Sequence, residues 1–220
     1  MTMSTEHRLI LKNFGPIKSA NITFGDFTVI IGPQATGKSI FLQTLKLILD
    51  RDHIHNIFNR YSMTFDNNSA AFLGGYFGKG MAAAWTNESS LVWEGKKIVL
   101  PTFAKHSKSK NWQEKEASLF LIPAQRVMSL ANGTTQNFGQ FSYGDPYALR
   151  YFSDTIHNLL QNEYGVKTEL FPQANRLNTV LREQIEKHLY GGSQVSVDTS
   201  DFTKRLVLNI PGHKEGLPYT

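Results

Sequence analysis

One short loop in this sequence has the residue types and the spacing to hold phosphate groups. It matches the pattern G-x-x-x-x-G-K-[ST] at every specified position. Glycines let backbone N–H groups turn toward an anion, the Lys38 ammonium can reach the β and γ phosphates of a nucleotide, and the Ser39 hydroxyl can bind Mg²⁺. We therefore expect nucleotide binding here, with a chance turn as the alternative. The loop and the residue after it are Gly32, Pro33, Gln34, Ala35, Thr36, Gly37, Lys38, Ser39 and Ile40.

The segments on either side of the loop are those that a phosphate site requires. Residues 27–31, "FTVII", form a β-branched run without polar alternation, typical of a strand buried on both faces of a parallel sheet. Beyond the loop, apolar residues with helical spacing predict a helix over about residues 38–50. The order strand, loop, helix favours the functional interpretation. The helix residues with this spacing are Phe41, Leu45, Ile48 and Leu49.

A second glycine cluster, "GGYFGKG" at residues 74–80, is superficially similar to the phosphate loop. It has no hydroxyl residue after Lys79, and the segments around it have a hairpin-like pattern. We therefore expect this cluster to be an ordinary loop.

The first half of the chain is otherwise strand-like. Residues 9–11 and 22–24 are short apolar pieces separated by a Gly-Pro turn signal. Residues 61–104 contain aromatic and aliphatic runs split by Gly and Asn, which predict antiparallel hairpins. Turns are expected at residues 87–90, "NESS", and at residues 94–97, "EGKK".

The second half alternates between strand and helix patterns. Residues 117–126, "ASLFLIPAQR", predict a buried core strand that Pro123 ends. Residues 145–192 predict helices, and residues 193–220 alternate like a hairpin. The first helical face contains Phe152, Ile156, Leu159 and Leu160, and the second contains Leu177, Val180, Leu181, Ile185, His188 and Leu189.

Length and composition limit the class of protein. The chain has 220 residues, enough for a single domain with one sizeable core, and a formal charge of +5 that permits anionic partners. There are no cysteines, which excludes disulfides and thiolate chemistry. No apolar run approaches the roughly 18 residues of a membrane span. We expect one cytoplasmic domain over residues 1–220.

The N-terminal segment, "LILKNFGPIKSANITFGDFTVIIGPQATGKSIFLQTLKLIL", resembles ABC-type ATPases of the RecF, SMC and OLD kind, the AAA-family ATPases found in bacterial defence systems. The resemblance lies in a first strand, the "KNFGPI" turn, a second strand, and then the phosphate loop. It implies an α/β P-loop NTPase fold of the ABC-ATPase type, with an antiparallel β side lobe, a helical segment, and ATP with Mg²⁺ as ligands.

The same resemblance suggests a further site residue. "LFLIPAQR" is similar to the strand that leads to the family's Q-loop, whose glutamine touches Mg²⁺ and the attacking water. Gln125 is therefore the candidate for a catalytic and metal-binding role. The alternative is an ordinary polar residue after a proline stop.

Two motifs of the family are not found in the sequence. Members carry a signature motif of the Ser-Gly-Gly/Gln type and a Walker B strand ending in Asp-Glu, whose acids hold Mg²⁺ and act as general base. "LILD" at residues 47–50 lies on the helix after the loop, and the apolar run at residues 205–208 ends in Asn209. We therefore expect an incomplete site that binds ATP and needs a completing segment for hydrolysis.

Three functions follow from these observations. The first is the ATP-binding part of an ABC/SMC-like ATPase that acts as a homodimer or with a completing chain, and with a DNA, RNA or effector-protein partner. The second is a non-catalytic nucleotide-binding regulator that docks on another ATPase or effector. The third is a nucleic-acid-binding module using "KHSKSK" at residues 105–110, although such a run is typical of a solvated loop.

Overall fold

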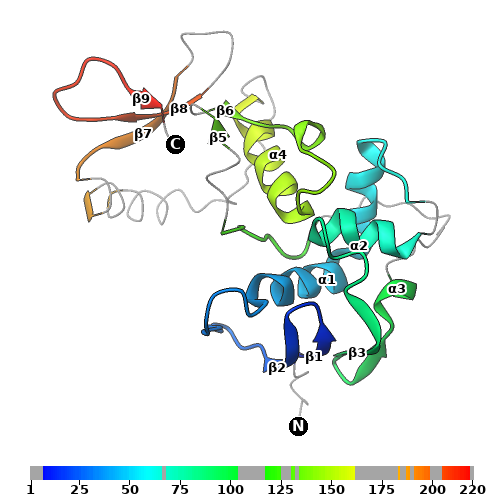
Figure 1. The fold of residues 1–220 in the computed structure, drawn as a ribbon. Coiled ribbons are helices and arrows are strands. Elements are labelled where there is room, and N and C mark those ends of the chain that lie inside the picture. The colour runs from blue at the N-terminus through cyan, green and yellow to red at the C-terminus, as the bar shows by residue number, and fades with distance from the viewer. Residues whose placement is uncertain are drawn as a thin grey trace. The chain divides into compact units, whose positions relative to one another are not determined.

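The computed structural model forms two compact units, shown in Figure 1 and described separately below. The first unit comprises residues 1–124 and 142–148, and the second comprises residues 125–141 and 149–220. The structure describes residues 7–65, 68–103, 117–124, 130–131, 134–161, 183, 187–188, 191–198 and 205–218.

The first unit is built on an antiparallel sheet with strand order β2-β1-β3-β4 (Figure 1). β1 alternates buried and exposed side chains, as expected of a strand with one face in a core. Leu11 of β1 is fully buried and lies opposite Ala20 of β2 on one side and Leu91 of β3 on the other. The strands are β1 (Arg8–Phe14), β2 (Ile17–Thr23), β3 (Trp85–Trp93) and β4 (Lys96–Ile98).

Three helices accompany this sheet, and the first confirms the helix expected after the phosphate loop. They are α1 (Lys38–Arg60), α2 (Ser69–Phe77) and α3 (Leu100–Phe103). α1 extends ten residues beyond the expected end at Asp50, where the backbone leaves helical geometry (φ −121°, ψ 26°). Phe41 and Leu45 are buried as predicted, but Leu49 is 42% exposed. The kink beside Leu49 interrupts the regular helical period on which the prediction depended.

The hairpins expected over residues 61–104 are only partly correct. β3 and β4 do form a hairpin, with its turn at Glu94 and Gly95, but the turn expected at residues 87–90 lies inside β3. The run before β3 is the helix α2, which Asn68 caps by accepting a hydrogen bond from the Ala71 N–H at 3.0 Å.

The second glycine cluster is likewise not simply a loop, because its first residues end α2. A Cβ at Gly74 would lie 3.4 Å from the Ala82 Cβ, and one at Gly75 would lie 3.0 Å from the ring of Phe65. These glycines therefore allow close packing against the helix. The "GG" pair favoured the prediction of a loop because glycine is disfavoured within helices.

The two core strands expected beside the phosphate site are not formed. Residues 27–31 and 117–124 belong to no strand, and their apolar side chains at alternate positions are exposed. The exposed fraction is 87% for Phe27 and Ile31 and 60% for Ile122. A strand buried on both faces needs neighbouring strands, and none of the described strands pairs with these segments.

The second unit contains α4 (Tyr147–Gln161), whose first two residues belong to the first unit, and two small antiparallel sheets. The Asp154 carboxylate of α4 accepts the Phe138 N–H at 3.0 Å, and the Ser153 hydroxyl donates to the Gln136 carbonyl at 2.6 Å. The hairpin of β7 and β8 confirms the predicted tail hairpin. The helical face expected from Leu177 to Leu189 lies outside the described residues except for His188. The smaller elements are β5 (Leu130–Ala131), β6 (Thr134–Thr135), η2 (Phe138–Gln140), β7 (Gln194–Asp198), β8 (Arg205–Asn209) and β9 (Leu217–Pro218).

Candidate functional site

The predicted phosphate loop forms a tight turn that leads into α1. Ala35 and Gly37 have left-handed backbone angles, with φ of 62° and 91°. The Thr36 hydroxyl donates to the Pro33 carbonyl at 2.9 Å across the turn. Gly37 is the N-cap of α1, and no side chain caps this end of the helix. The N–H groups of the first turn therefore keep their capacity to bind an anion.

Gly37 is also fixed by its contact with the β1–β2 turn. A Cβ at this position would lie 2.4 Å from Cγ1 of Ile17 and 3.2 Å from Cγ of Pro16. Ile17 begins β2 and is 5% exposed, so it has little room to move away. Pro16 and Ile17 therefore pack closely against the backbone of the loop, and only glycine fits at residue 37.

The two side chains expected to do chemistry differ in their present contacts. The Lys38 ammonium donates to the carbonyl oxygens of Gly32 and Pro33, at 2.8 and 2.5 Å. These are oxygen acceptors within the loop that phosphate oxygens can replace. The Ser39 side chain is exposed on the first turn of α1, and Ile40 follows it half-buried.

A cavity of about 490 Å³ lies beside the loop. It is lined by residues 16–20 and Ile22, by residues 30–33 and 36–38 of the loop region, and by Phe41. Its lining contains two charged side chains, Lys18 and Lys38, and no carboxylate. The volume is in the range of small-molecule sites, about 300–1,000 Å³. Size and charge therefore suit a bound anion of nucleotide dimensions.

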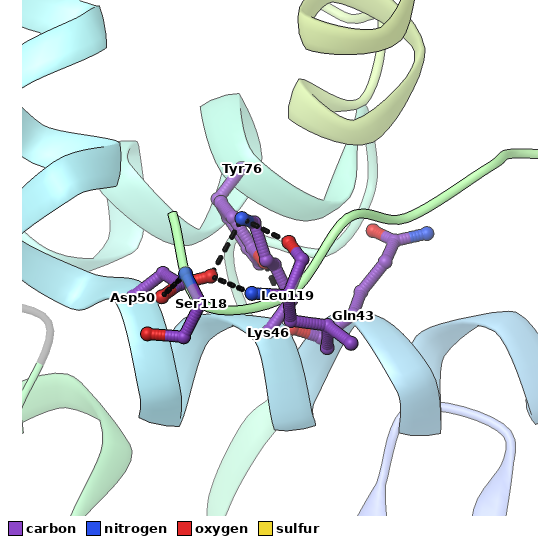
Figure 2. A network of polar contacts seen from close by, with 6 residues as sticks. All are labelled: Gln43, Lys46, Asp50, Tyr76, Ser118 and Leu119. Carbon is purple, nitrogen blue, oxygen red and sulfur yellow. Dashed lines mark hydrogen bonds and ion pairs between the residues drawn. The ribbon is translucent and has the colours of Figure 1, made fainter. Parts of the chain in front are cut away.

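Eight residues beyond Lys38 on α1, a buried polar network begins (Figure 2). The Lys46 ammonium lies 2.6 Å from the Asp50 carboxylate, and both side chains are almost fully buried. Asp50 also accepts the N–H groups of Ser118 and Leu119, at 2.7 and 3.0 Å, while Lys46 donates to the Leu119 carbonyl at 2.5 Å. Tyr76 donates to the Gln43 carbonyl nearby, at 2.8 Å.

Burial sets the electrostatics of this network. Desolvation lowers the pKa of Lys46, and Asp50 partly opposes this effect. Burial alone would raise the pKa of Asp50, but hydrogen bonds from Lys46, Ser118 and Leu119 outweigh it and leave that pKa below its ordinary value. Burial, together with the Asp50 charge, raises the pKa of Tyr76 well above its ordinary value. Asp50 is therefore ionised and Tyr76 neutral at neutral pH.

Comparison with known proteins gives this arrangement a family. A family model described as an AAA ATPase domain matches residues 7–208. The chain belongs to the AAA ATPase domain family. Membership indicates an ATP-binding P-loop protein, in agreement with the fold class and the ATP ligand that the N-terminal resemblance implies. Searches of curated proteins and of solved structures found no match.

Not every residue expected in the site of this AAA ATPase domain is described. Gln125 lies outside the described residues, as does the basic run at residues 105–110. Within the described ranges there is no group of three or more His, Asp or Glu side chains that could hold a metal ion. No helix of the described part has both the length and the apolar character needed to cross a membrane.

Several site residues were missed by sequence reasoning. Ile17 and Lys18 line the cavity from the start of β2, although the sequence marked this stretch only by a Gly-Pro turn signal and by its family resemblance. Lys46 and Asp50 lie four residues apart, a spacing that brings side chains together on a helix. Lys46 directly follows Leu45 of the apolar face, and this position was the available signal that it is buried in an ion pair with Asp50.

Proposed function

We propose that this AAA ATPase domain binds MgATP through residues 32–40. The observation that carries the proposal is the N-terminus of α1, where Gly37 is the N-cap and no side chain caps the helix. This end of the helix lies beside a cavity whose lining contains two lysines and no carboxylate. An anion there meets backbone N–H groups, the positive end of a helix dipole and two lysines. A role that depends on ATP is consistent with the cytoplasmic location expected from the sequence.

The residues present fit the phosphates of such a ligand. Lys38 can exchange its carbonyl acceptors, Gly32 and Pro33, for phosphate oxygens without moving from the loop. The exposed Ser39 hydroxyl is the proposed Mg²⁺ ligand, and Gln125 is proposed as a second ligand by resemblance. Bound Mg²⁺ would neutralise charge on the phosphates.

Hydrolysis is proposed to require a completing segment or chain that carries an acidic pair and a signature motif, because neither motif is found in this sequence. The supporting observation is the exposure of Phe27, Val29 and Ile31, the apolar side chains just before the loop. Such residues are typical of a central strand, so a completing strand would cover them as it brings in the acids. The completed site would then be of the ABC-ATPase type.

The first experiment tests the loop itself. Lys38→Ala is expected to weaken the binding of a fluorescent ATP analogue with Mg²⁺ about 10- to 100-fold, because a charge-assisted contact to phosphate is lost. Lys12→Ala removes an exposed lysine outside the cavity lining and serves as the control, with unchanged affinity expected. Equal affinity of Lys38→Ala and the wild type would contradict the proposal.

A second measurement separates the ATPase part from a regulator. Phosphate release by the isolated chain is expected at background, because the groups that activate water are not among the residues identified. Robust turnover would show that this chain supplies its own general base. A non-catalytic regulator shares the binding result, but adding a completing segment would not start its turnover.

A further inference from the structure

The Lys46–Asp50 pair links the helix of the phosphate loop to a segment far along the chain. Both residues belong to α1, and their 2.6 Å contact is buried, with side chains 2% and 1% exposed. They bond to Ser118 and Leu119, some 70 residues away in sequence. Figure 2 shows the charged pair on the helix and the main chain of these two residues above it.

The contact is made with the main chain of the segment, not with its side chains. The two Asp50 carboxylate oxygens accept the consecutive N–H groups of Ser118 and Leu119, and Lys46 donates to the Leu119 carbonyl. Hydrogen bonds of this kind are directional, so they hold the main chain of Ser118 and Leu119 in a defined place and orientation against α1.

A buried ion pair is a poor way to gain stability alone. Two charges lose their hydration on burial, and an apolar pair of similar volume often serves stability equally well or better. What an apolar pair cannot provide is hydrogen-bond partners for the main-chain N–H and C=O groups of Ser118 and Leu119. The particular effect of the charged pair is therefore to orient residues 117–124.

The distance to the phosphate loop is short. Lys46 follows Lys38 by eight residues, about 12 Å along a helix axis. The described helix is regular over this length, because its one non-helical residue is Asp50. The first turn of α1 and the Lys46–Asp50 anchor therefore belong to one regular stretch of helix, and a phosphate that restrains the first turn restrains the anchor with it.

We propose that Lys46 and Asp50 are positioning residues that couple nucleotide binding at the loop to the placement of residues 117–124. The proposal rests on the proposed function, since it takes the loop as the nucleotide site. Through Lys46 and Asp50, binding of nucleotide at the loop affects residues 117–124, which lie some 70 residues further along the chain.

The test is hydrogen exchange of the amides in residues 117–124, with and without a saturating non-hydrolysable ATP analogue and Mg²⁺. In the wild-type chain, nucleotide is expected to slow exchange at Ser118 and Leu119 about fivefold or more, the lower end of usual coupling between sites. Lys46→Met alone leaves Asp50 buried without its cation and is expected to raise exchange strongly, or to prevent folding.

The decisive variant is the double substitution Lys46→Met with Asp50→Leu, which replaces the ion pair by an apolar pair. It is expected to fold and to bind nucleotide, but nucleotide should no longer slow exchange in residues 117–124. Slowing that persists in the folded double variant would overturn the proposal, because a merely structural pair would leave the response to nucleotide intact.

The matched control is Arg51→Met, which removes the neighbouring ion pair to Asp52, where the side chains are 26% and 56% exposed. Such surface pairs contribute little, so the response to nucleotide should be unchanged. Absence of nucleotide binding by the wild type would defeat the proposed function itself. Binding by the wild type without slower exchange would defeat the coupling alone.

Discussion

Two apolar regions of the first unit have similar composition and opposite environments. β1 carries Leu9 and Leu11, which are fully buried between β2 and β3. Residues 27–31 carry a comparable aliphatic run, yet Phe27 and Ile31 are each 87% exposed. The difference is the presence of strand neighbours, because β1 is paired on both edges and residues 27–31 on neither.

This difference shows that an apolar run specifies a need for burial without specifying what supplies it. β1 obtains one neighbour from its hairpin partner β2 and the other from β3, which lies far along the same chain. Residues 117–124 are an intermediate case, because they also lack strand partners but are held to α1 by the charged side chains of Lys46 and Asp50. Each region should therefore respond to a different perturbation.

The largest expected effect separates the paired strand from the unpaired run. Leu11→Ala should lower the free energy of unfolding by about 2–5 kcal/mol, since it opens a cavity in a packed core. Ile31→Ala should change it by less than about 0.5 kcal/mol, because the side chain is 87% exposed. Urea unfolding of both variants measures the contrast, and a large loss for Ile31→Ala would show that residues 27–31 are packed in solution.

The next effect concerns the phosphate loop, residues 32–39, which directly follows residues 27–31. Gly37→Ala and Gly80→Ala both place alanine at a left-handed φ, 91° and 93°, which costs about 1–2 kcal/mol. A Cβ at Gly80 meets nothing within 4 Å, whereas one at Gly37 overlaps Ile17. Gly37→Ala should therefore cost at least about 1 kcal/mol more in unfolding free energy. Equal losses would mean that the loop does not rest on the β1–β2 turn.

The smallest effect near neutrality is expected from pH. It concerns residues 117–124, whose main chain is bound by the Asp50 carboxylate, and not residues 27–31. The pKa of Asp50 is lowered in the folded chain, so its stabilisation is present above the unfolded value and is lost as pH falls through the folded value. Exchange protection at Ser118 and Leu119, corrected for intrinsic rates, should be constant from about pH 7 to pH 5 and fall below about pH 4. Asp50→Asn should remove this acid response. Acid loss that persists in that variant would assign it to another group.

Much of the candidate site was predictable because its signals are local. The spacing of residues 32–39 and the helical period after them correctly gave a loop at the start of a helix. The tail alternation correctly gave the hairpin of β7 and β8. In each case the residues that decide the structure are neighbours in sequence, so a short window contains the necessary information.

The remaining features depend on contacts that a short window cannot contain. α2 was expected as a hairpin because aromatic residues and glycines outweigh its helix signal, although Asn68 is a good N-cap. Gly74 and Gly75 are explained only by the approach of Ala82 and Phe65. The single-domain organisation and the roles of residues 32–40 and Gln125 stay predictions.

The main-chain anchor on α1 has a consequence for which sequences the chain can tolerate. Asp50 and Lys46 contact backbone atoms of Ser118 and Leu119, so these two positions can change their side chains widely and keep the anchor. Proline is the exception, because it has no N–H to donate. Residues 118 and 119 should therefore accept many types of side chain but not proline, while Lys46 and Asp50 should vary only together.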